Sequence, residues 1–417
     1  MANVKISPSS LKGKVVLPAS KSVAHRALIC AALSGGTSEI KCDCTSRDIN
    51  ATVCALKALG AKIKIQKNVY TVSGIVPQRN LKINCFESGS TARFLLPVAA
   101  ALGVDAQFIG EGRLPERPFD DLCDVLRQNG VNCSSNKLPI DISGVFSGER
   151  FVLPGNVSSQ YVSGVLLAAP LMNKDVAVQI KGTLESEPYV DITIDVMGKF
   201  GVKVQKTKDG YFVKGGQNYT STDVKVESDW SAAAFFMSAA AIGGEIALEG
   251  LNFASSQGDM AALDVFAAFG AEISIVGQTL FVKKGKRLRG ISVDVSQIPD
   301  MVPAIAATAA FADGETKITG AARLRLKESD RITAVCNALK AMGVSVAEEK
   351  DGIIIKGSKV SGGKVDGVND HRIVMAFSIA ANFASGETEI KDSRAVGKSY
   401  PEFFRDFEKI GGKVNEF

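Results

Sequence analysis

The chain repeats one pattern six times, and this repetition restricts the possible folds more than any other feature of the sequence. The pattern is an amphipathic helix followed by a glycine and a strand, as in "ATVCALKALGAKIKI" and "ITAVCNALKAMGVSV". A glycine is the usual residue just after a helix, so each copy predicts its own helix end. The six glycines lie 68 to 73 residues apart: Gly60, Gly130, Gly201, Gly270, Gly343 and Gly411.

A second pattern alternates with the first. It is a polar start, a helix of small apolar residues, a glycine or another helix stop, and usually a strand, as in "SKSVAHRALICAALSGG" and "SDWSAAAFFMSAAAIGG". These helices are apolar nearly all round, so we expect them to be buried. Each repeat then reads as helix, strand, helix, strand, strand. The sequence predicts an α/β protein built from six such units.

The six units favour two lobes of three over a single solenoid, because typical solenoid repeats run to about 45 residues or fewer. We place the boundary near Glu227, just before the fourth small-residue helix. One lobe is then residues 20–226. The opening segment "VKISPSSLKGKVVLP" is free to close the sheet of the sixth unit. The other lobe is therefore expected to be discontinuous, with residues 1–19 and 227–417.

Composition excludes several classes of protein. A net charge of +5, one Trp and the absence of a long Lys/Arg run argue against nucleic acid as a partner. No apolar stretch has the length of a signal peptide or a membrane span, so we expect a cytoplasmic protein that does not bind membranes. Eight cysteines and only two histidines, His25 and His371, favour reduced buried thiols over a metal site.

The stretch "KESDR" starts one amphipathic helix with an unusual charge pattern. Lys327 and Arg331 lie beside the positive end of the helix dipole, which is unfavourable by about a few tenths of a kcal/mol. Ser329 and Asp330 are expected to cap the helix. A bound anion would explain the cations, because free N–H groups and the dipole at a helix start attract phosphate and carboxylate.

Similar polar starts recur along the chain, and together they predict a small substrate that carries several negative charges. Single members have simpler explanations: Asp229 and Ser90 as caps, Arg93 as an ion pair, and His25 as a packed histidine. His371 is as compatible with catalysis as with packing. The starts hold these residues: Lys21, Ser22, Arg26, Ser88, Gly89, Ser90, Arg93, Arg113, Arg117, Ser158, Ser159, Gln160, Ser186, Tyr189, Asp229, Asp300, Lys327 to Arg331, Asp370 to Arg372 and Lys398.

In this order along the chain, "PASKSVAHRAL", "SGSTAR", "LPERP", "VSSQYVSGVLLAAPL", "ESEPYVDITIDVM", "LRLKESDRI", "NDHRIVMAFS" and "GKSYPEFF" resemble the enolpyruvyl transferases. The resemblance covers nearly the whole chain and is strongest to the 3-phosphoshikimate 1-carboxyvinyltransferases. It implies two lobes of three βαβαββ units, with helix N-termini facing a cleft between the lobes. It also implies transfer of the enolpyruvyl group of phosphoenolpyruvate to the 5-hydroxyl of shikimate 3-phosphate, with release of phosphate, in aromatic amino-acid biosynthesis. No cofactor or metal is implied, and a monomer is expected.

Matching positions carry the roles that the resemblance implies. Lys21, Asp300 and Glu328 would be catalytic. The lobe of residues 20–226 would mainly bind shikimate 3-phosphate, and the other lobe would hold the carboxylates and much of the phosphoenolpyruvate site. The shikimate 3-phosphate contacts would be Lys21, Ser22, Arg26, Ser158, Ser159, Gln160, Ser186, Tyr189, Asp300 and Lys327. The phosphoenolpyruvate contacts would be Lys21, Gly89, Arg117, Gln160, Arg331, Arg372 and Lys398.

Three positions depart from the family pattern: Glu87 where Asn is more frequent, Ser90 where Thr is common, and Arg323 where some members have Asn. They affect local contacts and leave the reaction class intact. Gly89 is retained, so sensitivity to glyphosate, a family inhibitor that competes with phosphoenolpyruvate, is expected. The main alternative is UDP-N-acetylglucosamine 1-carboxyvinyltransferase, which typically has a catalytic Cys in the loop that corresponds to "EGRLPERPFDD". That segment has no Cys. A non-catalytic anion-binding repeat protein would not need Asp300 and Glu328 among the cations.

Overall fold

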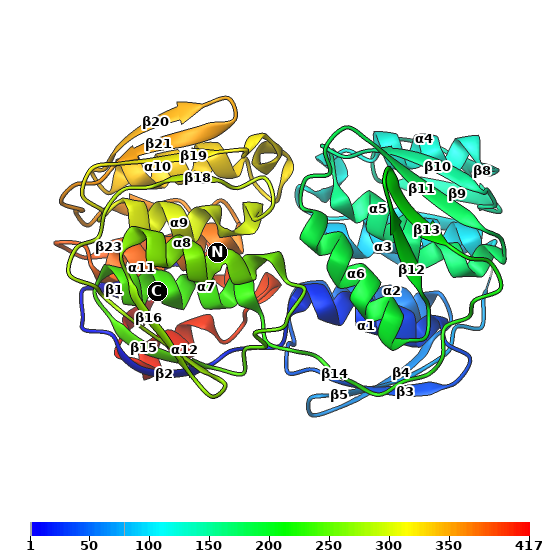
Figure 1. Cartoon of the computed structure of the whole chain (residues 1–417), viewed down its shortest axis with the longest axis horizontal. Coiled ribbons are helices and arrows are strands. Elements are labelled where there is room, and N and C mark those ends of the chain that lie inside the picture. Colours follow the sequence, from blue (N-terminus) through cyan, green and yellow to red (C-terminus); the bar gives the residue numbers. More distant parts are fainter. Residues whose placement is uncertain (1, 79) are drawn as a thin grey trace. The chain divides into compact units, whose positions relative to one another are not determined.

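The computed structural model describes residues 2–78 and 80–417, and the chain forms two compact units (Figure 1). Unit 1 consists of Met1–Pro18 and Glu227–Phe417, and unit 2 consists of Ala19–Val226. Each unit contains three four-stranded sheets and both kinds of helix that the sequence predicted. No helix in the described part of the chain is long and apolar enough to cross a membrane.

Unit 2 contains three sheets of the same topology, ordered β14-β3-β5-β4, β6-β7-β9-β8 and β10-β11-β13-β12. The first pair in each sheet is parallel and the other two pairs are antiparallel. The strands are β3 (Thr37–Lys41), β4 (Lys62–Gln66), β5 (Val69–Ser73), β6 (Leu81–Asn84), β7 (Ala106–Ile109), β8 (Val131–Cys133), β9 (Ile140–Gly144), β10 (Arg150–Pro154), β11 (Val176–Lys181), β12 (Val204–Thr207), β13 (Gly210–Val213) and β14 (Val224–Lys225).

Unit 1 repeats this topology in the orders β16-β17-β15-β2, β18-β19-β21-β20 and β22-β23-β1-β24. The strands are β1 (Val4–Ser7), β2 (Lys12–Val16), β15 (Glu245–Glu249), β16 (Glu272–Val276), β17 (Thr279–Lys283), β18 (Ser292–Asp294), β19 (Glu315–Thr319), β20 (Ser345–Glu349), β21 (Gly352–Lys356), β22 (Lys364–Val365), β23 (Thr388–Ile390) and β24 (Lys413–Glu416).

The opening segment divides into two strands with different partners. β1 lies between β23 and β24, so the predicted closure of the sixth sheet is confirmed. β2 comes just before the first helix of unit 2 in the sequence, yet it pairs with β15 of unit 1. In return, β14 precedes the first helix of unit 1 in the sequence and pairs with β3 of unit 2. The chain thus exchanges the leading strands of its first and fourth repeats.

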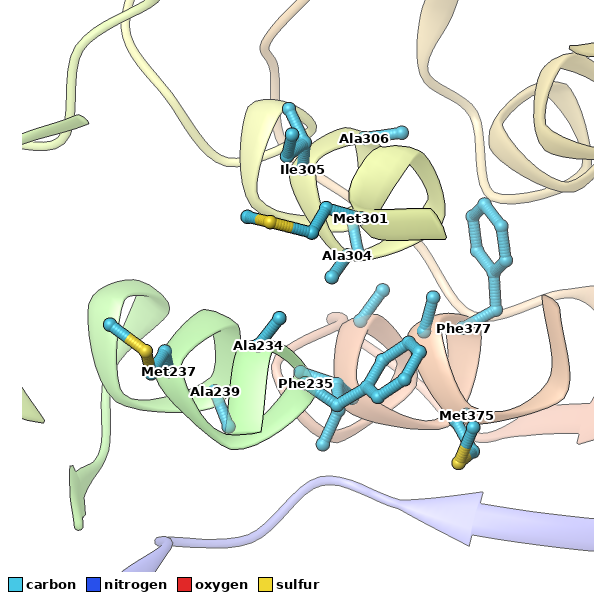
Figure 2. Close-up of a cluster of buried hydrophobic side chains, with 14 of the residues drawn as sticks. Ala234, Phe235, Met237, Ala239, Met301, Ala304, Ile305, Ala306, Met375 and Phe377 are labelled. Carbon is cyan, nitrogen blue, oxygen red and sulfur yellow. The ribbon is translucent and has the colours of Figure 1, made fainter. Parts of the chain in front are cut away.

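Six helices of small apolar residues are buried along almost their whole length, as predicted. In unit 1, α7, α9 and α11 contact one another, and Figure 2 shows Phe235, Met301 and Phe377 among the alanines that separate them. Small side chains allow close helix approach while the large ones fill the remaining space. These helices are α1 (Lys21–Leu33), α3 (Gly89–Ala101), α5 (Ser159–Ala168), α7 (Trp230–Ile242), α9 (Val302–Ala309) and α11 (His371–Asn382).

Six further helices are amphipathic, and the repeated glycine follows each of them. All six glycines have φ between 78° and 106°, a region that favours glycine because it has no Cβ. The periodic glycines of the sequence are therefore six helix stops. The helices are α2 (Arg47–Ala58), α4 (Asp120–Gln128), α6 (Glu187–Lys199), α8 (Ala262–Phe269), α10 (Arg331–Ala341) and α12 (Phe403–Lys409).

The cysteines are free thiols, and six of the eight are buried. Cys54 is exposed on α2, so the expectation of buried thiols is wrong at that position.

Candidate active-site residues

In unit 2, the start of α1 brings three candidate residues close together. Lys21 donates to the Asp48 carboxylate of α2 at 2.8 Å, and both side chains are mostly buried. Arg26, one turn further along α1, donates to the backbone carbonyls of Ser22 at 2.7 Å and Tyr189 at 2.8 Å. The ammonium group of Lys21 is thus oriented by a carboxylate that the sequence analysis did not single out.

Arg26 is only 2% exposed, and four protein groups receive its hydrogen bonds. Its guanidinium also donates to Thr193 at 2.6 Å and Ser163 at 3.4 Å, and it lies 4.7 Å from the centre of the Phe94 ring. Burial lowers the pKa of Arg26 to about 9. In this structure Arg26 holds Ser22 and Tyr189 in place.

A second group in unit 2 lies at the starts of α3 and α5. Gly89 is the first residue of α3, and a Cβ there would lie 2.6 Å from Nη1 of Arg117. The Arg117 guanidinium, 5% exposed, therefore packs directly against the backbone at Gly89. Gln160 of α5 accepts from Arg93 at 2.8 Å and donates to Ser90 at 2.9 Å. Arg93 joins the two helix starts through this hydrogen bond.

Ser158, Ser159 and Ser186 lie at the starts of α5 and α6. Ser158 caps α5 by accepting from the Gln160 amide at 3.3 Å, and Ser159 is 6% exposed. Ser186 precedes α6 with a φ of 55°, a left-handed conformation that is uncommon for a residue with a Cβ. Such strain is maintained only where the surrounding structure requires it, and it often marks functional positions.

In unit 1, five candidate residues form one connected network of charges. Asp300 lies 2.8 Å from Nη2 of Arg372, 3.0 Å from Nη1 of Arg331 and 3.6 Å from Nζ of Lys327. Arg331 also donates to Glu328 at 2.7 Å. The two arginines are almost fully buried, whereas the side chains of Asp300, Lys327 and Glu328 are 15% to 26% exposed.

Asp370 anchors this network and was not predicted as a functional residue. It is fully buried at the N-terminus of α11, where it accepts from the Arg372 amide at 2.9 Å. It also accepts from Nε of Arg331 at 2.8 Å and from the Ser329 hydroxyl at 2.9 Å. One carboxylate thus ties the start of α10 to the start of α11. The sequence placed Asp370 at a helix start but gave no sign of the contact with Arg331, which lies 39 residues earlier.

The network shifts the pKa values of its members in opposite directions. Burial on its own would raise the pKa of Asp300, but Arg372, Lys327 and Arg331 together hold it well below its usual range. Burial lowers the pKa of Lys327 to about 8, although Asp300 opposes the change. Asp300 is therefore a carboxylate at neutral pH, and Lys327 is a cation that loses its proton far more easily than an exposed lysine.

Lys398 and His371 lie beside this network. Lys398 is 3% exposed and donates to the carbonyl of Asn369 at 2.6 Å, next to Asp370 in sequence. His371 is 1% exposed, with Nδ1 4.0 Å from Asp370. His25 in unit 2 is fully buried, which confirms the packed histidine expected from sequence.

Of the four predicted caps, two are confirmed and two are wrong. Asp330 caps α10 and Asp229 caps α7, each by accepting from a backbone amide of the first turn. Ser329 instead donates to Asp370, and Ser90 accepts from Gln160. Local sequence identified which residues could cap but not which had a stronger partner elsewhere in the fold.

Comparison with known proteins adds evidence that is independent of this geometry. A sequence model of EPSP synthase (3-phosphoshikimate 1-carboxyvinyltransferase) matches residues 6–407. Proteins named 3-phosphoshikimate 1-carboxyvinyltransferase are similar along the whole chain: that of Clostridium novyi is 40% identical and that of Clostridium kluyveri 42%. The alignment covers 100% of this chain and 99% of either relative.

Solved structures give the same result for the fold. An EPSP synthase from Acinetobacter baumannii superposes with a TM-score of 0.84 at 28% identity, with both chains covered completely. The enolpyruvyl transferase NikO from Streptomyces tendae superposes with a TM-score of 0.80 at 16% identity, over 100% of this chain and 98% of the other, which shows a shared fold only. The predicted enolpyruvyl-transferase fold is thus confirmed. Because the family model and the curated relatives match nearly end to end, the chain belongs to the EPSP synthase family.

Proposed function

We propose that the chain transfers the enolpyruvyl group of phosphoenolpyruvate to the 5-hydroxyl of shikimate 3-phosphate and releases phosphate. The observation that carries the proposal is the network around Asp300, which places a carboxylate among three cations. Relatives at 40% to 42% identity carry the name of this activity. The product would enter the synthesis of chorismate and the aromatic amino acids.

The charges support two anionic substrates. Phosphoenolpyruvate and shikimate 3-phosphate together carry two phosphates and two carboxylates. Arg331, Arg372 and Lys398 in unit 1, with Lys21 and Arg117 in unit 2, would serve phosphoenolpyruvate. Gly89 and Gln160 complete that proposed set. Cations held in advance of binding stabilise negative charge at little reorganisation cost.

The proposed shikimate 3-phosphate contacts lie at helix starts, mainly those of unit 2. Helix starts offer free N–H groups and a favourable dipole to a phosphate. Serine and tyrosine hydroxyls would bind the ring hydroxyls and the phosphate oxygens. The proposed contacts are Lys21, Ser22, Arg26, Ser158, Ser159, Gln160, Ser186, Tyr189, Asp300 and Lys327.

The proposed chemistry requires two proton transfers in each direction. The vinyl CH₂ carbon takes up a proton and becomes a methyl group, while the 5-hydroxyl loses its proton and its oxygen bonds to the adjacent carbon. A tetrahedral intermediate forms. The methyl group then gives up a proton, the departing phosphate takes up the proton that the 5-hydroxyl lost, and the vinyl group is restored on the new oxygen. Each transfer needs an acid or a base near the reacting atom.

We assign the hydroxyl proton to Asp300. With Arg372 and Arg331 at 2.8 Å and 3.0 Å, this carboxylate is a weak base. When a substrate carboxylate or phosphate approaches those guanidiniums, its negative charge offsets part of their positive potential and raises the pKa of Asp300. The base would therefore strengthen as the substrates bind. Glu328, with Lys21, is assigned to the methylene carbon.

An assay of phosphate release tests the proposal. The expected result is phosphate release from phosphoenolpyruvate with shikimate 3-phosphate as acceptor. Release only with UDP-N-acetylglucosamine would instead support the related nucleotide-sugar enzyme, and release with neither would support a binding protein. Glyphosate is expected to compete with phosphoenolpyruvate in the same assay, and light scattering is expected to give the mass of a monomer.

Asp300→Asn tests the assignment of the base. Loss of a general base is expected to lower kcat by about 10² to 10⁴-fold. Asp313→Asn is the matched control, because Asp313 is an exposed carboxylate of unit 1 that pairs with Arg287 at 2.8 Å. Full turnover by Asp300→Asn would contradict the assignment.

A further inference from the structure

A chain of buried hydrogen bonds connects the first three helices of unit 2. Nδ1 of His25 on α1 lies 2.7 Å from the Thr52 hydroxyl on α2. That hydroxyl lies 2.7 Å from the Thr91 hydroxyl on α3, which donates to the Ser88 hydroxyl at 2.8 Å. His25, Thr52 and Thr91 are 0% exposed, and Ser88 is 1% exposed.

The direction of the hydrogen bonds in this chain can be assigned. Thr91 gives its only hydroxyl proton to Ser88, so Thr52 must donate to Thr91, and Nδ1–H of His25 must donate to Thr52. Burial, Lys21 and Arg26 keep the pKa of His25 well below its usual value, so the ring is neutral and has one N–H. Nε2 has no hydrogen-bond partner within the described residues, which agrees with a proton on Nδ1. The chain therefore runs one way, from His25 to Ser88.

The chain of hydrogen bonds ends at Ser88, the N-cap residue of α3. Ser88 caps this helix, because its hydroxyl also accepts from the Thr91 amide at 3.2 Å. The next residue is Gly89, against whose backbone the Arg117 guanidinium packs. A shift of the α3 start by a few tenths of an ångström would move the surface on which Arg117 rests.

The same helices also hold Lys21. Lys21 precedes His25 by four residues on α1, and Asp48 precedes Thr52 by four residues on α2. The Lys21–Asp48 and His25–Thr52 contacts are therefore successive links, one helical turn apart, between α1 and α2. The Lys21–Asp48 ion pair and the hydrogen-bond chain thus join the same two helices, and Lys21 is proposed to contact both substrates.

Unit 1 contains a buried hydroxyl pair without this extension. Ser238 of α7 and Thr308 of α9 lie 2.7 Å apart, and Thr308 donates to the Ala304 carbonyl at 3.0 Å. Both residues lie well inside their helices and away from the helix starts. Thr308 has the same side chain and the same complete burial as Thr52, so it is a matched control for substitution.

We propose that His25, Thr52 and Thr91 are positioning residues for phosphoenolpyruvate, which fix the start of α3 and through it Gly89 and Arg117. This inference rests on the proposed function. It predicts the larger effect on phosphoenolpyruvate. The hydrogen-bond chain ends at the α3 start, beside Gly89, whereas the shikimate 3-phosphate contacts proposed in unit 2 lie at the starts of α1, α5 and α6. The contacts at the start of α1 keep the Lys21–Asp48 ion pair and the hydrogen bonds of Arg26 when Thr52 or Thr91 is replaced.

The experiment compares the full-length wild type with Thr52→Val, Thr91→Val and Thr308→Val, and measures KM for each substrate, kcat and the melting temperature. Valine keeps the shape of threonine and removes the hydroxyl. Each of Thr52→Val and Thr91→Val removes a hydroxyl that makes two buried hydrogen bonds. The resulting shift of the α3 start predicts a rise in KM for phosphoenolpyruvate of about tenfold, with KM for shikimate 3-phosphate within about twofold. Thr52→Ser is expected to restore the wild-type value. Thr308→Val is expected to change the melting temperature alone.

Each other outcome overturns a defined part of the reasoning. A wild type that releases no phosphate refutes the proposed function, and the inference with it. An active wild type whose Thr52→Val and Thr91→Val variants keep the normal KM for phosphoenolpyruvate refutes the positioning role alone. Equal changes in both KM values, or the same KM change in Thr308→Val, would show a general loss of packing. If Thr52→Val and Thr91→Val both fail to fold, the chain of hydrogen bonds stabilises the fold as a whole and has no specific role in binding.

Discussion

Replacing Asp370 with asparagine is expected to destabilise unit 1 far more than an ordinary helix-cap substitution. The two oxygens of Asp370 accept four hydrogen bonds: from the Arg372 amide, from Ser329 and two from Arg331. Asparagine has one oxygen to accept with, and its NH₂ group would face donors. The substitution also removes the negative charge closest to Nε of the buried Arg331.

The expected cost follows from these contacts. Removing one partner of a buried ion pair typically costs about 3 to 5 kcal/mol, because the remaining charge stays buried without compensation. Asp300 and Glu328 still pair with Arg331 at 3.0 Å and 2.7 Å and offset part of that loss. We therefore expect Asp370→Asn to lower the free energy of unfolding by about 3 kcal/mol.

The assay is urea-induced unfolding followed by tryptophan fluorescence. The chain has one tryptophan, Trp230, fully buried at the start of α7 in unit 1, so the signal reports the unit that carries the substitution. The control is Asp229→Asn. Asp229 also caps a small-residue helix of unit 1, and asparagine is about as good a cap as aspartate. We expect the control to change the unfolding free energy by less than about 0.5 kcal/mol.

The reasoning would be refuted by a small difference between the two variants. If the midpoint of Asp370→Asn lies within experimental error of that of Asp229→Asn, the contacts of Asp370 with Arg331 add nothing to stability beyond a helix cap. A changed m-value would have a different meaning, because it reports a change in the surface exposed on unfolding.

Three further predictions concern stability and binding. Burial and Asp300 raise the pKa of Asp259 to about 6, so the native state favours the protonated acid and wild-type stability falls as pH rises towards 6. At pH 7.5, the free energy of unfolding in urea should therefore be higher for Asp259→Asn than for the wild type by up to about 3 kcal/mol. A difference of the same size at pH 4 would contradict this. Gly89→Ala should displace Arg117 and raise KM for phosphoenolpyruvate about tenfold with unchanged melting temperature; an unchanged KM would show that Arg117 is not a ligand. Lys327 has a pKa of about 8 and should lose its charge above that pH. The value of kcat/KM for shikimate 3-phosphate should therefore fall as pH rises through 8. A profile that stays flat to pH 9.5 would argue against Lys327 as a phosphate contact.

The architecture could be predicted from sequence because its signals are local and repeated. Each glycine such as Gly60 or Gly343 occupies a left-handed position after an amphipathic helix, and each small-residue helix is buried on all sides. Six independent copies of one signal made the repeat clear. The exchange of β2 and β14 was not predictable, because each strand has the same pattern whichever sheet it joins.

The candidate site was predictable in its residue types and less so in its contacts. The cations of "KESDR" were unfavourable beside a helix dipole, which pointed to Lys327 and Arg331 from local sequence alone. The carboxylates that pair with Arg331 and Lys21, which are Asp370 and Asp48, lie far from them in the sequence. Hydrogen-bond partners at that distance follow from the packing of helices, which one sequence does not specify.

The partners of β1 and β2 determine when these two strands can pair during synthesis. A ribosome makes β1 and β2 before unit 2, and it makes β15, the partner of β2, only after unit 2. β1 remains without its partners for longer, because β23 and β24 are made after β15. Unit 2 has all of its own strands once residue 226 has emerged, so it can fold while the nascent chain still carries two unpaired strands ahead of it. Lysines in β2, at Lys12 and Lys14, oppose pairing with a wrong edge during that interval. The two similar units are therefore completed at different times: unit 2 has all of its strands early, and unit 1 depends on strands that are translated later.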